Sequence, residues 1–298
     1  MASPTSPGRT PGGAPSRDPL EAWLAALEAR YLEALTFQEV ARSARALSSA
    51  YVERRGGLSR GRALEGRGKR AAFALLYGPL HFLLVREVVC ALDASSLHLE
   101  VLADVGCGTL VAGVAWATVL GSRPRVMGFD RHRWALDEAE WMLRQWRLRG
   151  HLSRVDADRA RLPGRQSGIV AAFAVNELGA GARARLLDNL RRAARQGASV
   201  LVVEPIATSA TPWWDEWRDV FVGEGGRADL WRFEVELPDV VKRLDRAAGL
   251  RHDELTGRSL WLPAQNRRDA ATKTRAQSTS EATSTHSTAA CAPSPEGP

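Results

Sequence analysis

Cysteine is scarce in this sequence. Its 298 residues include three cysteines, Cys90, Cys107 and Cys291, which lie far apart along the chain. An odd number at such spacing provides neither a disulfide framework nor the paired ligands of a zinc site. We therefore expect no metal and a reducing compartment, the cytoplasm.

Long apolar runs are also missing. No run reaches the roughly 18 residues that a membrane-spanning helix needs, so we expect no membrane partner. Residues 1–17 are rich in Pro, Gly, Ser and Thr without an apolar stretch, which excludes a secretory signal and predicts a disordered tail. Residues 264–298 have a similar composition and predict a second disordered tail.

Lysine is rare as well, so arginine provides most of the positive charge behind the formal net charge of +7. The largest patch of one sign lies within residues 54–70, where arginines alternate with glycines. Two interpretations stay open: the stretch neutralises phosphates of an RNA partner, or it is a solvated loop in an arginine-rich chain.

Residues 99–113 carry the most informative pattern. Leu99–Ala103 predicts a short buried strand, Gly106 and Gly108 predict a tight turn, and Val111–Leu120 predicts a buried helix. A strand, a glycine turn and a helix form the nucleotide-binding start of a doubly wound sheet. The glycines let the backbone approach a ligand that a Cβ atom would push away.

Two cofactor classes use this geometry. The dinucleotide fingerprint needs a small residue where this chain has Val111, which argues against a nicotinamide-dependent oxidoreductase. The segment Asp104-Val-Gly-Cys-Gly-Thr109 instead resembles the first motif of class I S-adenosylmethionine (SAM)-dependent methyltransferases. The resemblance implies that Asp104 and the turn (Gly106, Cys107, Gly108) hold SAM. That family usually has a third glycine at the position of Leu110.

The rest of the chain is consistent with this resemblance. Strands and helices alternate from residue 94 to 263, which indicates a largely parallel sheet. Seven strands match the class I methyltransferase sheet, whose last strand is antiparallel. The sequence therefore predicts an α/β fold, a Rossmann-like seven-stranded methyltransferase sheet, after an N-terminal helical unit over 18–93. The expected strands are 99–103, 125–129, 151–155, 168–175, 198–203, 231–237 and 255–262.

The helical unit shows clear start signals. Asp18 is the expected N-cap of a first helix, and Thr36 with Glu39 forms a capping box for a second. A third helical stretch, 70–92, is expected to be interrupted at Gly78-Pro79 because proline removes a backbone donor.

Two acids are candidates for binding the nucleoside. Asp130 ends the second strand and is expected to accept both ribose hydroxyls, with Arg131 beside it; a helix N-cap is the alternative role. Asp158-Arg-Ala-Arg-Leu-Pro163 resembles the family's D-x-x-x-L-P segment, whose acid contacts the adenine amino group. Asp156 is the alternative for this contact, and a solvated loop acid is the structural alternative for Asp158.

The candidate catalytic residues follow the fourth strand. Glu177 is a candidate general base and Asn176 a candidate to orient the acceptor or contact SAM; both are equally consistent with a simple loop cap. The candidate substrate contacts are aromatic or imidazole side chains that are otherwise expected in the core. They are Tyr77, His81, Trp213 and Trp214.

Four segments resemble a narrower family, the ribosomal small-subunit-associated methyltransferase-like proteins. They are Ala50–Arg54, Asp104–Gly108, Ala174–Leu178 and Leu201–Pro205. That family typically carries cysteine ligands for a metal centre after the fifth strand, and this chain has none there, so we expect no metal.

We therefore expect a SAM-dependent methyltransferase whose acceptor, RNA, protein or small molecule, stays open. The alternative is a non-catalytic protein of SAM-binding fold that binds RNA or ribosomal particles.

Overall fold

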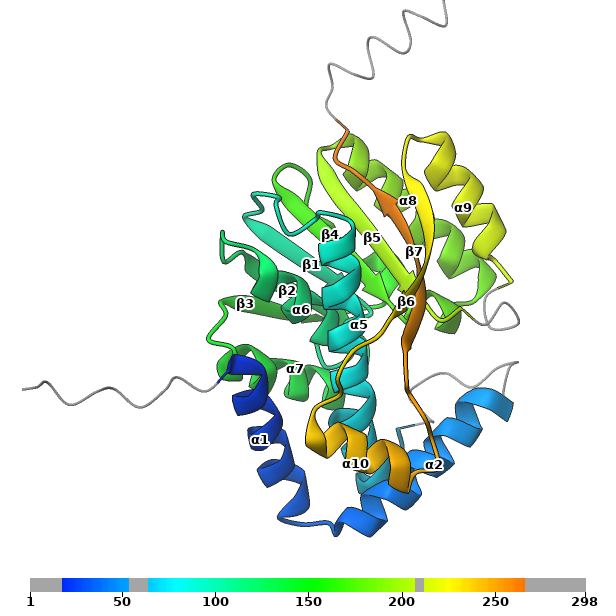
Figure 1. The fold of residues 1–298 in the computed structure, drawn as a ribbon. Coiled ribbons are helices and arrows are strands. Elements are labelled where there is room, and N and C mark those ends of the chain that lie inside the picture. The colour runs from blue at the N-terminus through cyan, green and yellow to red at the C-terminus, as the bar shows by residue number, and fades with distance from the viewer. Residues whose placement is uncertain (1–17, 54–63, 207–211, 266–298) are drawn as a thin grey trace, which may run out of the picture.

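A seven-stranded sheet forms the centre of the molecule (Figure 1). The computed structural model describes residues 18–53, 64–206 and 212–265. The strand order is β3-β2-β1-β4-β5-β7-β6, in which the first five pair in parallel and β7 pairs antiparallel with β5 and β6. The predicted fold class is confirmed. The strands are β1 (Val101–Val105), β2 (Arg125–Asp130), β3 (Gly150–Arg154), β4 (Ser167–Ala172), β5 (Ala198–Glu204), β6 (Arg227–Phe233) and β7 (Leu255–Leu262).

Helices cover both faces of this sheet, each with its own apolar cluster. One face is covered by α8 (Ala180–Arg195) and α9 (Trp214–Gly223). The N-terminal helices pack with the other face into one continuous core, so the predicted helical unit is part of the same globule. The helices on that second face are α1 (Pro19–Leu32), α2 (Phe37–Glu53), α4 (Arg67–Ala72), α5 (Gly78–Ala91), α6 (Val111–Val119), α7 (Arg133–Gln145) and α10 (Asp239–Ala247).

The predicted helix starts are present. The Asp18 carboxylate accepts the N–H of Leu20 at 3.1 Å. At the start of α2, Thr36 N–H donates to Glu39 Oε2 at 2.8 Å, and Glu39 N–H donates to Thr36 Oγ1 at 3.3 Å. These bonds from Thr36 lower the pKa of Glu39, because they stabilise the carboxylate.

The predicted break at Gly78-Pro79 is wrong. Helix runs from Arg67 to Ala91, and a π-helical turn, Phe73–Tyr77, precedes the proline. Gly78 N–H bonds Phe73 O, one residue further back than in an α-helix, and this wider turn accommodates the proline ring. By length and composition this helix is able to cross a membrane, but 72% of the window tested is buried inside the protein, as in a core helix.

Several predicted boundaries shift because strand pairing decides them. β1 continues through Asp104 to Val105, and β4 stops at Ala172. β6 begins four residues before the predicted strand, since Arg227 pairs with Trp261 of β7. The predicted tail beginning at 264 starts too early, because Ala264 N–H donates to Ser199 Oγ. Residues 1–17, the arginine-rich loop 54–63 and residues 266–298 lie outside the described residues.

Candidate functional site

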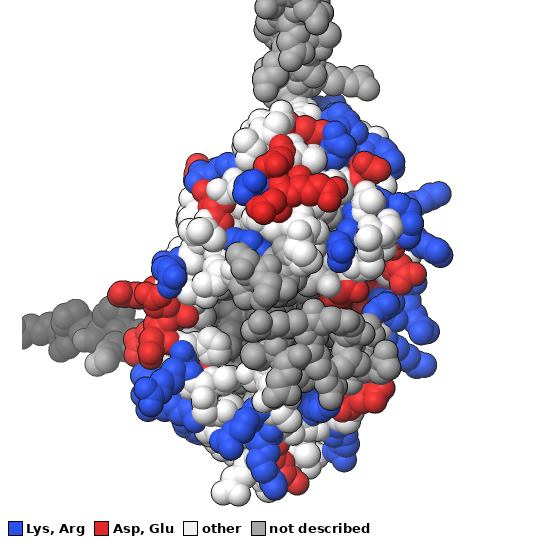
Figure 2. Space-filling view, turned by 90° about the vertical axis from the view of Figure 1, so that its right-hand side faces the viewer, with Lys and Arg blue, Asp and Glu red and all other residues white. Residues whose placement is uncertain are grey.

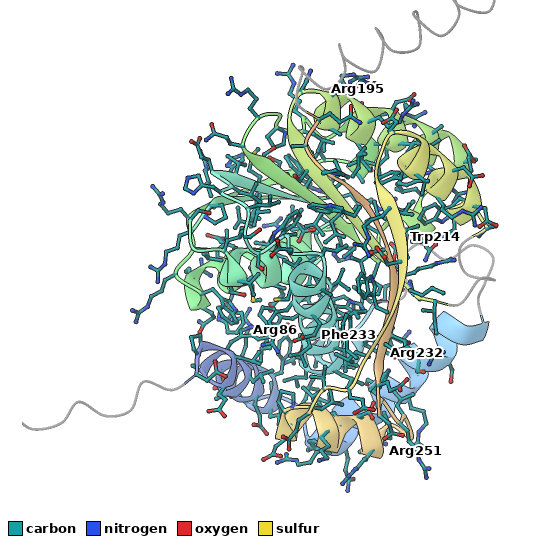
Figure 3. The ribbon with its side chains drawn as sticks, turned by 45° about the horizontal axis from the view of Figure 1, so that its top comes forward. Arg86, Arg195, Trp214, Arg232, Phe233 and Arg251 are labelled. Atoms are coloured by element: carbon teal, nitrogen blue, oxygen red, sulfur yellow. The ribbon has the colours of Figure 1, made fainter. Side chains whose placement is uncertain are left out.

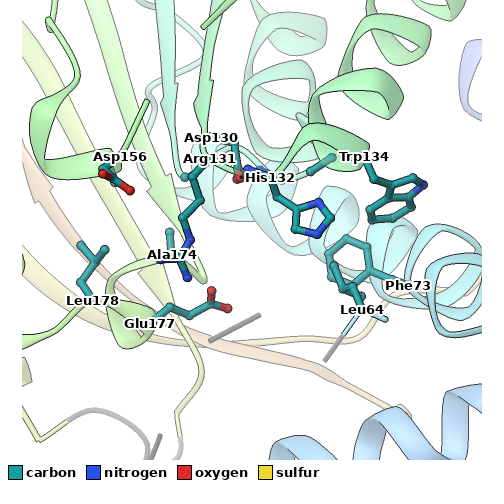
Figure 4. A pocket seen from close by; sticks show the side chains of 14 residues that line it. Leu64, Phe73, Asp130, Arg131, His132, Trp134, Asp156, Ala174, Glu177 and Leu178 are labelled. Carbon is teal, nitrogen blue, oxygen red and sulfur yellow. Dashed lines mark hydrogen bonds between the residues drawn. The ribbon is translucent and has the colours of Figure 1, made fainter. Parts of the chain in front are cut away.

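A pocket lies at the carboxyl edge of the parallel strands (Figure 4). The glycine turn after β1, the ends of β2 and β3 and the loop after β4 form its walls, and the N-terminal helices close one side. Its empty volume, with the open mouth included, is about 670 Å³. The lining residues are Leu64, Phe73, Gly106, Gly108, Asp130, Arg131, His132, Trp134, Ala135, Asp156, Ala157, Ala174, Glu177 and Leu178.

The glycine turn is held by bonds within the protein. Gly106 and Gly108 have positive φ angles of 67° and 51°, which glycine adopts without strain. The N–H groups of Gly106 and Cys107 both donate to Phe129 O, at 2.8 and 3.0 Å. A Cβ atom on Gly106 would lie 2.6 Å from Cβ of Ala174. The first glycine is therefore required by the closeness of the loop after β4 as well as by its φ angle.

Asp130 joins this turn to the end of β2. Its Oδ2 accepts the N–H of Gly108 at 2.9 Å, and its Oδ1 accepts the N–H of His132 at 2.8 Å. A carboxylate has about four acceptor positions, so each oxygen retains capacity for a second donor. Asp130 lines the pocket, so this remaining acceptor capacity is available to a ligand there.

Asp104 has a different position. It is 1% exposed, and its Oδ2 accepts the N–H of Gly113 in the first turn of α6 at 2.7 Å. The described residues that line the pocket include neither Asp104 nor the buried Cys107. The acid of the first motif thus orients α6 against β1, and the carboxylate of this motif region that reaches the pocket is that of Asp130.

Leu110 takes a backbone conformation that glycine adopts more readily than leucine. Its φ is 69°, in the left-handed region, and it is the N-cap of α6. The side chain is fully buried under the turn, against Gly128 of β2. Because Leu110 packs into the core, it does not narrow the pocket.

Asn176 and Glu177 follow β4 in a 3₁₀ turn, η3 (Val175–Glu177). Asn176 Nδ2 donates to Oε2 of the fully buried Glu204 at 2.7 Å, and Trp213 Nε1 donates to Asn176 Oδ1 at 2.9 Å. Glu204 Oε1 also accepts the N–H of Val175 at 3.0 Å. Asn176 is therefore an anchor for the loop, whereas Glu177 lines the pocket.

The two acids after β3 separate. Asp156 lies on the pocket wall beside Ala157. Asp158 is 7% exposed, its carboxylate is 2.7 Å from Arg185 Nη2, and its carbonyl accepts from Asn189. Asp158 is thus tied to α8 and absent from the described pocket lining, whereas the alternative acid, Asp156, lies on it.

An aromatic wall closes the side formed by the N-terminal helices. Phe73 and Trp134 line the pocket and meet edge to face, with ring centroids 6.4 Å apart. The His81 ring stacks on the Phe173 ring, with their centroids 3.7 Å apart. Burial raises the pKa of the Tyr77 hydroxyl. Neither Tyr77 nor His81 is among the described lining residues. The sequence reasoning missed Phe73, which lies four residues before Tyr77 on the same helix.

Trp213 and Trp214 are core residues. Each is 6% exposed, and both belong to the cluster between the sheet and α9 (Figure 3 labels Trp214). Arg258 of β7 stacks on Trp214, with its Cζ 4.1 Å from the ring centroid. Burial lowers the pKa of Arg258. Neither tryptophan is among the described residues of the pocket wall, so their contact with a substrate stays a prediction.

Comparisons with known proteins find distantly similar solved structures. No protein-family model matches the sequence, and no curated protein matches it either. Among solved structures, the mitomycin 7-O-methyltransferase MmcR is 14% identical, with a TM-score of 0.48 over 84% of this chain and 74% of that one. The plantazolicin methyltransferase BpumL with SAH and a pentazolic analog is 9% identical, with a TM-score of 0.48 over 77% and 98%. The magnesium protoporphyrin IX methyltransferase of Synechocystis is 13% identical, with a TM-score of 0.42 over 62% and 84%.

The strand order, rather than these low scores, defines the fold. Five parallel strands with an antiparallel β7 inserted between β5 and β6 form the Rossmann-like seven-stranded sheet that the sequence predicts. The glycine turn and Asp130 lie at the carboxyl edge, where such sheets bind their ligands.

Proposed function

We propose that this protein is a SAM-dependent methyltransferase. The observation that carries the proposal is the position of Asp130, on the pocket wall and bonded to the glycine turn. When bound, SAM supplies a methyl group on a positively charged sulfur, which passes to an acceptor nucleophile and leaves S-adenosylhomocysteine.

The residues present fit this cofactor. Asp130 would hold the ribose hydroxyls through the remaining acceptor capacity of its two oxygens. Asp156 would accept a hydrogen bond from the adenine amino group. The turn at Gly106 and Gly108 would leave room for the methionine end. Among the described residues, the pocket wall carries three acidic side chains, Asp130, Asp156 and Glu177, beside one arginine, Arg131. This negative balance favours a cationic sulfonium.

A dinucleotide fits the same pocket less well. Dinucleotide sites bind a pyrophosphate with free N–H groups at the start of the first helix. Here the N–H groups of Gly106, Cys107 and Gly108 already donate to Phe129 O and to the Asp130 carboxylate. A phosphate would also meet the charge of Asp130, so the turn favours a cofactor without a pyrophosphate.

Glu177 is the residue that we propose as a base when the acceptor carries a proton that it does not readily lose. It lines the pocket, and in Figure 4 the Arg131 side chain points in its direction. Asn176 is proposed as a positioning residue, because its bonds to Glu204 and Trp213 fix the loop that carries Glu177.

A second candidate is a non-catalytic protein of the same fold that binds RNA or ribosomal particles. The likeness to ribosomal small-subunit-associated methyltransferase-like proteins in segments such as Ala174–Leu178 favours it. For both candidate functions, we propose that the protein acts in the cytoplasm and uses neither a metal ion nor a membrane partner.

Calorimetry and turnover separate these candidates. We expect SAM and S-adenosylhomocysteine to bind and NAD(P) not to bind. Incubation with methyl-labelled SAM and fractionated cell extract is expected to label one class of acceptor. Absence of SAM binding at millimolar concentration contradicts both SAM-fold candidates, whereas binding without any labelled product favours the non-catalytic one.

A further inference from the structure

One open edge of the sheet carries a row of exposed arginines. β3 pairs only with β2 among the described strands and forms the left edge in Figure 1. We call the row the basic edge. None of its members has a salt bridge to a described acid, and its members are Arg123, Arg125, Arg147, Arg149 and Arg154.

Strand register brings these arginines together. Val126 of β2 pairs with Gly150 of β3. The residues just before them, Arg125 and Arg149, are therefore neighbours on adjacent strands, and Val126 N–H donates to Arg149 O at 2.9 Å. Arg123 and Arg147 each lie two residues earlier in the turns that lead into β2 and β3. At the opposite end of β3, Arg154 lies beside Asp130 of β2 in the strand register.

The basic edge leads to the pocket. Arg154 Nε donates to the carbonyl of Arg131 at 3.2 Å, and Arg131 lines the pocket. β3 has five residues, which span roughly 16 Å at about 3.3 Å per residue. Four of the five arginines therefore lie at the amino end of these strands, and Arg154 lies at their carboxyl end, beside the pocket.

Few carboxylates balance this charge. Residues 123–165 contain 11 arginines and 6 acids. Glu138 and Asp158 pair with Arg30 and Arg185, which belong to other helices. Glu140 pairs with Arg144. The opposite side of the molecule differs, because Figure 2 shows positive and negative side chains interspersed there, with pairs such as Arg232–Glu254.

We propose that the basic edge docks the phosphate backbone of single-stranded RNA and leads it to the pocket. This proposal rests on the proposed function, because the RNA would be the methyl acceptor. Guanidinium groups bind phosphate oxygens with two parallel donors, and such contacts position a strand without reading its sequence. A protein partner would need an apolar interface centre, but the apolar residues here, Leu148 and Leu152, pack against the internal core.

The test measures the anisotropy of a fluorescein-labelled single-stranded RNA at two salt concentrations. Five phosphate contacts give a slope of about −3.5 in a plot of the logarithm of the association constant against the logarithm of the salt concentration. The affinity is therefore expected to fall on the order of 100-fold between about 50 and 200 mM salt. The edge variant combines Arg125→Ala, Arg149→Ala and Arg147→Asn; asparagine is chosen because Arg147 has a φ of 50°. Its slope is expected to flatten by about 2.

The control variant combines Arg218→Ala, Arg232→Ala and Arg243→Ala, which removes the same charge from three paired arginines. It is expected to keep the wild-type slope, and both variants are expected to keep the wild-type SAM affinity in calorimetry. Equal slopes for the two variants, no RNA binding at the lower salt, or equal displacement of RNA by polyglutamate would each overturn the proposal. Failure of the wild type to bind SAM would instead contradict the proposed function and leave the RNA result intact.

Discussion

Replacing Asp130 by asparagine tests the proposed cofactor site most directly. Asparagine has the same shape but one acceptor oxygen and no charge. Asp130 now accepts two N–H groups, from Gly108 and His132, at 2.9 and 2.8 Å. The variant keeps one of these bonds at most, and it loses the charge-assisted bonds proposed to the ribose.

Two magnitudes follow. Loss of the charge-assisted ribose bonds is expected to cost about 1.5–3 kcal/mol of binding free energy, which weakens SAM affinity roughly 10- to 100-fold. Loss of one backbone bond in the turn is expected to lower the free energy of unfolding by about 1–2 kcal/mol, or the melting temperature by roughly 2–4 °C.

Calorimetry measures the first effect and thermal melting the second, at a temperature where both proteins are folded. Asp137→Asn is the matched control, since Asp137 is exposed on α7 and outside the described pocket wall; it is expected to change neither quantity. A folded Asp130→Asn protein that binds SAM with wild-type affinity would refute the assignment of the ribose site.

Three further predictions concern packing and stability. Leu110→Gly relieves left-handed strain but empties a fully buried site, so a net loss of about 1–3 kcal/mol is expected in denaturant titration; tighter SAM binding would show instead that Leu110 narrows the pocket. Thr36→Ala removes the cap of α2 and is expected to cost about 0.5–2 kcal/mol, whereas Thr36→Ser retains stability; equal melting temperatures would contradict this. Arg30→Met leaves Glu138, 4% exposed, without its cation at 2.7 Å, and about 1–3 kcal/mol is expected to be lost after allowance for the exposure of Arg30. Arg144→Met at an exposed pair is the control, and an equal loss there would refute the argument.

Local sequence determined the parts of this protein that depend on neighbouring residues. The strand, glycine turn and helix from β1 to α6 were predictable, because positive φ angles require glycine within a few positions. The capping bonds at Asp18 and Thr36 were predictable because their partners lie two or three residues away. Asp130 was predictable as a pocket residue, because the end of a strand after such a turn always lies at the same edge of the sheet.

Tertiary structure decided which of several similar residues reaches the pocket. Asp156 and Asp158 are two residues apart, and only the position of Arg185 on α8 shows that Asp158 is already paired. Tyr77 was a candidate substrate contact from the sequence, but the packing of the N-terminal helices brings Phe73, four residues earlier, to the described pocket wall.

The anchor of Asn176 was equally beyond local sequence, because its partner Glu204 lies on another strand. The direction of Leu110 depended on the space beside Gly128 of β2. A sequence pattern shows that a side chain is buried or polar, but its partner is chosen by strand register and helix packing, which join residues far apart in the chain.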